Sequence, residues 1–79
     1  MNPTRLRILR YLRTFNAQYQ RLPTLGELAH NLDISRLSLN EHLHVLARLG
    51  WLKLGERSDG VYVTWYRIPG ELQMLEREG

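Results

Sequence analysis

The chain has 79 residues, 43% of them hydrophobic, a length that allows one domain and leaves little core for a large catalytic cleft. Eleven basic residues against eight acidic ones give a formal net charge of +3. Cysteine is absent, which excludes disulfides, thiolate zinc sites and a cysteine nucleophile.

No apolar run approaches the roughly 20 residues that span a bilayer. The N-terminus lacks the apolar stretch of a signal peptide. We therefore expect a cytoplasmic, nucleoid-associated protein with no membrane partner. The basic surplus lies at the N-terminal end, where residues 1–22 contain no acidic residue but hold Arg5, Arg7, Arg10, Arg13 and Arg21. Arginine binds phosphate through a bidentate fork, so a polyanionic partner is favoured.

Helical periodicity predicts a first helix over residues 4–20 that ends before Pro23. A second helix is predicted over residues 25–32, because Thr24 and Glu27 have the spacing of a capping box. The expected buried stripe of the first helix is Ile8, Leu9, Leu12, Phe15 and Tyr19, and that of the second is Leu25, Leu28, Ala29 and Leu32.

A third helix is predicted over residues 36–49, with Ser35 as its N-cap and Gly50 as the left-handed residue after it. Its core face is expected to hold Leu39, Leu43, Leu46 and Leu49, bordered by His42 and Ala47. Its opposite face is expected to hold Leu37, Asn40, Glu41, His44 and Arg48.

After Gly50 the period changes to two, which predicts a β-hairpin over residues 51–68 with a turn-rich loop at 55–60. Alternation places Tyr62, Thr64 and Tyr66 on one face and Val61, Val63 and Trp65 on the other. Both faces carry apolar bulk, so we expect one to cover the core. The other is expected to meet a short C-terminal helix over residues 70–78 or a second subunit.

The segment Leu28-Ala29-His30-Asn31-Leu32-Asp33-Ile34-Ser35, followed by His42-Leu43 and Leu46-Ala47-Arg48-Leu49-Gly50-Trp51-Leu52, resembles a winged helix-turn-helix. Bacterial regulators of the MarR and ArsR type carry a similar pattern. A closer likeness is to the N-terminal DNA-binding domain of LexA-type repressors, which share a Pro-Thr-x-x-Glu cap and a His-Leu-x-x-Leu-Ala-Arg segment. The expected fold is thus mainly α with a small hairpin: a three-helix core, a two-stranded wing and a short C-terminal helix, in one domain over residues 1–79.

The chain departs from the LexA pattern, since the only lysine among its 79 residues is Lys53, and we expect no self-cleaving Ser/Lys domain. The turn before the third helix is also one residue shorter. We therefore expect a freestanding winged helix without a sensor or protease domain.

The resemblance implies that the third helix enters the major groove and reads bases. Arg36 would pair with guanine O6 and N7, and Asn40 would pair bidentately with adenine. Glu41 would accept from cytosine N4, Leu37 would meet a thymine methyl group, and His44 is a further reader.

The same resemblance assigns phosphate contacts around that helix. Ser38 suits a phosphate at the helix N-terminus, and Arg57 in the wing suits the minor groove or adjacent phosphates. Arg7 and Arg10 are candidates for the flanking backbone, and Thr24 and Thr64 are weaker phosphate candidates.

Two functions remain open on the sequence. One is a sequence-specific repressor of bacterial or phage type that binds double-stranded DNA as a homodimer. The other is a winged-helix module, from a phage or mobile element, that docks on a protein of the transcription or replication machinery. The third helix is nearly neutral and shows Leu37 on its solvent side, which favours the second alternative. No enzyme or cofactor is expected, because Ser35, Ser38 and Ser58 are explained as cap, helix and turn residues. No metal is expected either, because His42 and His44 diverge by roughly 200° on a helix.

Overall fold

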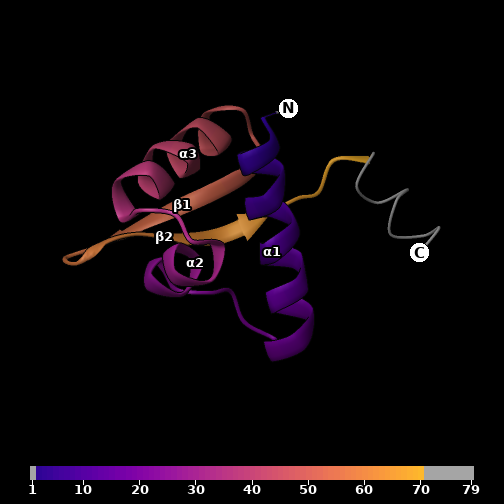
Figure 1. Ribbon diagram of the computed structural model, residues 1–79, viewed down its shortest axis with the longest axis horizontal. Helices are drawn as coiled ribbons and strands as arrows, with labels where there is room; N and C mark the ends of the chain where they lie inside the picture. The colour runs from indigo at the N-terminus through magenta and orange to yellow at the C-terminus, as the bar shows by residue number, and fades with distance from the viewer. Residues whose placement is uncertain (1, 71–79) are drawn as a thin grey trace.

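The computed structural model describes residues 2–70, which form three helices followed by a two-stranded antiparallel hairpin (Figure 1). The helices are α1 (Pro3–Tyr19), α2 (Leu25–Leu32) and α3 (Arg36–Arg48), and the strands are β1 (Leu52–Arg57) and β2 (Gly60–Tyr66). The expected mainly helical fold with a small hairpin is confirmed, and each helix begins and ends within one residue of its predicted bounds. The helix predicted over 70–78 lies outside the described residues, apart from its first position.

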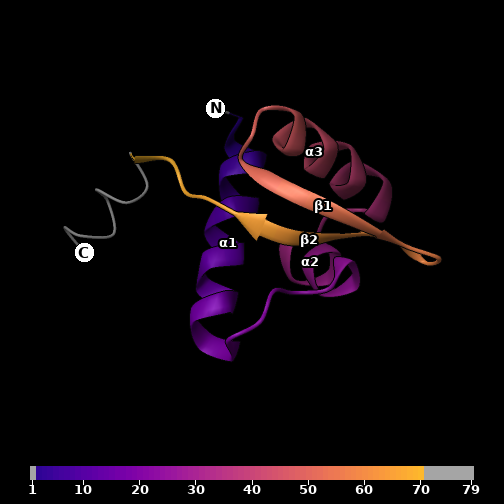
Figure 2. The same ribbon diagram turned by 180° about the vertical axis from the view of Figure 1, so that it is seen from behind.

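The three helices and the hairpin enclose one apolar core. In Figure 1 the hairpin runs behind α2 and α3, and Figure 2 shows it in front of them, with α1 along one side. No helix within residues 2–70 is both long and apolar enough to cross a membrane. The side chains with less than 2% exposure come from all three helices and β1, and they are Ile8, Leu9, Leu12, Leu28, Leu39, Leu43, Leu46 and Leu52.

The helix ends follow the predicted capping chemistry. Thr24 Oγ1 accepts from the Glu27 backbone N–H at 3.1 Å, and the Glu27 carboxylate accepts from the Thr24 N–H at 2.9 Å, which completes the capping box of α2. Ser35 Oγ accepts from the Ser38 N–H and so caps α3. Gly50 has a φ of +85°, the left-handed turn expected after that helix.

Two residues predicted for the core stripes are exposed instead. Leu49 is 55% exposed, because α3 ends at Arg48 and Leu52 of β1 enters the core after the turn. Tyr19 is 52% exposed because it lies at the last turn of α1, where its ring contacts Phe15 at 4.5 Å between centroids. Helical periodicity locates the buried face of a helix but not the point along its length where the core ends.

The hairpin is more tightly turned than the sequence predicted, and its first strand runs through part of the predicted loop. The strands run to Arg57 and resume at Gly60, so a two-residue turn at Ser58 and Asp59 replaces the expected loop over 55–60. Cross-strand pairing continues through the polar residues of that segment, down to the pair of Arg57 with Gly60.

A β-bulge overturns the predicted alternation in β2. Lys53 pairs with Trp65 but the next residue, Leu54, pairs with Val63, so Thr64 has no partner across the sheet. The Thr64 hydroxyl donates to the Lys53 carbonyl at 3.2 Å.

Because of the bulge, side chains after Thr64 lie on the opposite face of the hairpin from the one that strict alternation predicts. Val63 is 5% exposed and Tyr66 also packs on the core, although strict alternation placed them on opposite faces. Trp65, predicted to share a face with Val63, is 43% exposed, and its ring lies 5.4 Å from the Lys53 ammonium. The expectation that one face of the hairpin covers the core is met, with different residues.

Candidate nucleic-acid interface

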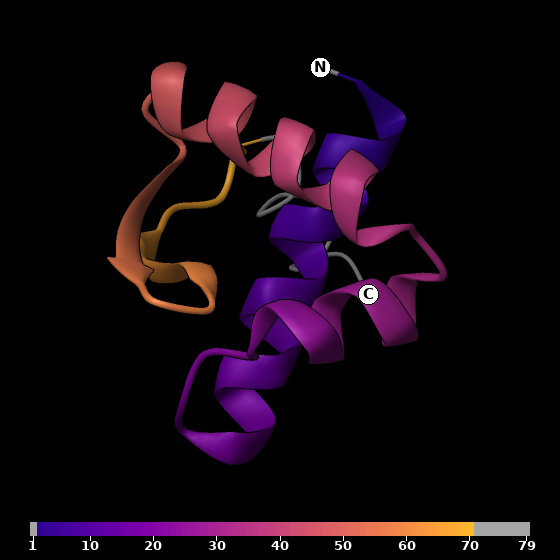
Figure 3. The same cartoon turned by 90° about the vertical axis from the view of Figure 1, so that its left-hand side faces the viewer.

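One side of α3 faces away from the core and is largely exposed. Leu39, Leu43 and Leu46 are fully buried, whereas Leu37 is 72% exposed on the other side. Figure 3 shows α3 crossing this face of the domain, with α2 below it, the hairpin beside it and α1 behind. The residues predicted for the outward face lie there as expected, with Leu37, Glu41, His44 and Arg48 exposed and Asn40 half-buried.

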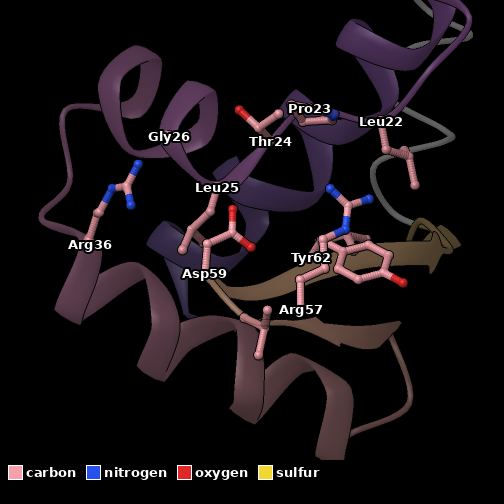
Figure 4. Close-up of a pocket in the computed structure, with 11 residues that line it drawn as sticks. Leu22, Pro23, Thr24, Leu25, Gly26, Arg36, Arg57, Asp59 and Tyr62 are labelled. Atoms are coloured by element: carbon pink, nitrogen blue, oxygen red, sulfur yellow. The ribbon is translucent and has the colours of Figure 1, made fainter.

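Beside the start of α3, a hollow of about 240 Å³ opens between α2 and the hairpin (Figure 4). Its apolar wall comes from the segment before α2 and from β2. Its polar side chains include Arg36, Arg57 and Asp59, so two guanidinium groups and one carboxylate leave it net positive. The lining residues are Leu22, Pro23, Thr24, Leu25, Gly26, Arg36, Arg57, Asp59, Val61, Tyr62 and Val63.

Arg36 reaches this hollow beside Gly26, the second residue of α2. A Cβ placed on Gly26 would lie 2.9 Å from Nη2 of Arg36, so a side chain there would require the end of this flexible arginine to shift. The guanidinium therefore lies over the first turn of α2, as Figure 4 shows. Leu25 and Gly26 are the first two residues of that helix. A helix N-terminus beside an arginine is an environment that favours an anion.

Arg57 is held on the other side of the hollow by the hairpin. Its guanidinium carbon lies 4.0 Å from the centroid of the Tyr62 ring, a cation–π distance. The Tyr62 ring itself lies over Gly55, its cross-strand partner. The wing thus presents its arginine against the Tyr62 ring.

The start of α2 is fixed by an ion pair with Arg21, in the segment that joins α1 to α2. Arg21 donates to both carboxylate oxygens of Glu27, at 2.9 and 3.0 Å, and its guanidinium lies 4.8 Å from the Phe15 ring centroid. The Arg21 hydrogen bonds, followed by the Thr24 backbone N–H, lower the pKa of Glu27 to about 2. The capping box therefore keeps its charge well into acid.

We expect this carboxylate to make stability depend on acid. Since the pKa of Glu27 is lower in the folded state, its contribution is complete above its unfolded pKa of 4.5 and is lost as the pH falls to about 2. Glu27→Gln keeps an acceptor for the Thr24 N–H but removes the titration. Urea unfolding between pH 5 and 2, with roughly half-unit steps, should show a smaller acid loss in the variant than in the wild type. Equal losses in the two proteins would contradict this assignment.

Of the other candidate phosphate ligands, only Thr24 lines the hollow. Its hydroxyl oxygen already caps α2 there. Ser38 is exposed in the first turn of α3. Nη2 of Arg7 donates to the Leu32 carbonyl at 3.3 Å, which ties this side chain to the end of α2 instead. Arg10 is exposed on α1 and, like Arg7, does not line the hollow.

The sequence interpretation overlooked Gly26 and Tyr62, which lie against the two arginines. Nothing local identifies them, because each acts on a residue brought close by the fold. Within residues 2–70 no cluster of three or more histidine, aspartate or glutamate side chains could hold a metal ion. His42 is half-buried, with its Nδ1 lacking a hydrogen bond inside that range, while His44 is exposed.

The order of elements defines the class of protein: three helices, the third exposed along one side, followed by a two-stranded wing, form a winged helix-turn-helix. A family model described as a helix-turn-helix domain matches residues 1–53, and the chain belongs to that family. This membership indicates a DNA-binding regulator. No curated protein matches the chain significantly.

Proposed function

We propose that this protein is a sequence-specific regulator that places α3 in the major groove of double-stranded DNA. The observation that carries the proposal is the exposed side of α3 in a helix-turn-helix domain. Its 13 residues are anchored by buried leucines on one side, while the other side offers polar and apolar groups to a partner. An α-helix of this kind fits the major groove, where each base pair has a distinct pattern of donors and acceptors.

The positions of the side chains support two separate roles, contact with bases and contact with phosphates. Asn40, Glu41, His44 and Leu37 lie on the exposed side of α3, where base edges would be read. Arg36 lies back on α2 and shares the hollow with Arg57, so we assign both arginines to backbone phosphates rather than to a guanine. Thr24 and Ser38 are secondary phosphate contacts in this arrangement.

The test is selection of bound sites from random duplexes, followed by affinity measurements across a salt series. A sequence-specific regulator should enrich a defined motif, and log Kd should change linearly with log salt, since each neutralised phosphate contributes about 0.9 to the slope. The absence of an enriched motif, or binding that does not respond to salt, would contradict the proposal.

We further propose that the protein acts as a homodimeric repressor on an inverted repeat. Trp65 on the outer face of the hairpin and Leu49 after α3 are large exposed apolar side chains that a second subunit would cover. Two copies would give a two-fold symmetric reader whose half-sites repeat in inverted orientation. Mass in solution, measured with and without DNA, tests the stoichiometry. Transcription from a promoter that carries the selected motif tests repression.

The alternative is a module that docks on another protein. It is favoured by the 72% exposure of Leu37 and by the near-neutral outer side of α3, which carries one cation, Arg48, and one acid, Glu41. Pull-down of one defined partner by the wild type and its loss in Leu37→Asp, together with no DNA binding, would favour this function over the first.

A further inference from the structure

The imidazole of His44 is held in one orientation by its own helix. Nδ1 of His44 lies 2.8 Å from the backbone carbonyl oxygen of Asn40, one turn earlier. A carbonyl oxygen can only accept, so the hydrogen of this bond belongs to Nδ1. In the neutral ring, Nε2 therefore carries a lone pair and no hydrogen.

The surroundings of this ring leave its second nitrogen available to a partner. His44 is exposed, and it lines a shallow hollow whose other lining residues, Asn40, Glu41, Val45 and Arg48, all belong to α3. The charged groups that face the ring there are one carboxylate, of Glu41, and one guanidinium, of Arg48. No side chain from another element within residues 2–70 lines this hollow.

The two protonation states of such a ring suit different bases. A neutral Nε2 accepts a hydrogen bond, and the donors on the floor of the major groove are the exocyclic amines of cytosine and adenine. A protonated ring donates from Nε2, and guanine offers two acceptors, N7 and O6, with no donor. Imidazole ordinarily changes between these states in the range of pH 5 to 8.

We propose that His44 is a specificity-determining residue whose base preference changes with pH, from an exocyclic amine when neutral to guanine when protonated. The inference rests on the proposed entry of α3 into the major groove. The contact of Nδ1 with the Asn40 carbonyl sets the tautomer, and the tautomer decides whether Nε2 of His44 accepts or donates. The sequence alone does not show this contact.

The experiment is selection from random duplexes at about pH 8 and about pH 5 at constant ionic strength. One position of the enriched motif should change from cytosine or adenine to guanine on the contacted strand. For duplexes that differ only there, the affinity ratio should change by roughly two- to tenfold between the two pH values, the effect of one hydrogen bond. Helical circular dichroism at both pH values establishes that the domain is folded in each measurement.

Two variants separate the role of His44 from other effects of acid. His44→Gln cannot titrate, so its preference at that position should be the same at both pH values. His30→Gln, an exposed histidine on α2, should retain the wild-type change. A preference that does not change with pH, or a change that persists in His44→Gln, overturns the inference even though DNA binding stands. The absence of an enriched motif at either pH defeats the proposed function itself.

Discussion

Leu43→Ala is expected to lower the free energy of unfolding by about 2–5 kcal/mol. Leu43 has no exposed surface and lies in the core formed by α1, α2, α3 and the hairpin, so truncation removes buried methyl groups and leaves a cavity. A domain of this size has little stability in reserve, and such a loss would leave much of the population unfolded. Urea denaturation monitored by circular dichroism measures the change.

The matched controls are two leucines associated with the same helix. Leu37→Ala and Leu49→Ala should each change stability by less than about 0.5 kcal/mol, since both side chains are more than half exposed. A loss at Leu49 close to that at Leu43 would mean that Leu49 is part of the core, as its spacing predicted, and would contradict the fold described above.

Asn40→Ala is expected to weaken binding to the selected DNA motif by about 1–3 kcal/mol, or roughly 5- to 150-fold, with the loss confined to one base pair. Asn40 lies on the exposed side of α3, where its amide can donate to and accept from an adenine edge. Arg36→Ala should instead weaken binding to every sequence and reduce the salt slope by about 0.9, because its guanidinium lies in the hollow beside α2.

The control for this pair is Asn31→Ala on α2, whose amide donates to the Glu27 carbonyl of its own helix. Its DNA affinity and sequence preference should equal those of the wild type. Equal effects of Asn40→Ala on all duplexes would assign this residue to the phosphates. If Arg36→Ala lowered the affinity only for duplexes changed at one base pair, Arg36 would be assigned to a guanine instead of a phosphate.

Local sequence determined the three helices and their ends. The capping box of Thr24 and Glu27, the Ser35 cap and the left-handed Gly50 each depend on residues within a few positions of one another, so local chemistry is enough to identify them. Leucine periodicity likewise identified the buried side of α3. Most of its outer side followed directly, because residues opposite a buried stripe face solvent.

Only the tertiary structure decided where side chains from different elements meet. Arg36 of α3 lies close to Gly26 of α2, and Arg57 of β1 lies over the Tyr62 ring of β2. The bulge at Thr64 changed which hairpin residues enter the core, since period two holds only while the strands pair without an extra residue. Spacing along a chain specifies directions about one helix or strand, whereas the contacts between elements depend on how those elements pack.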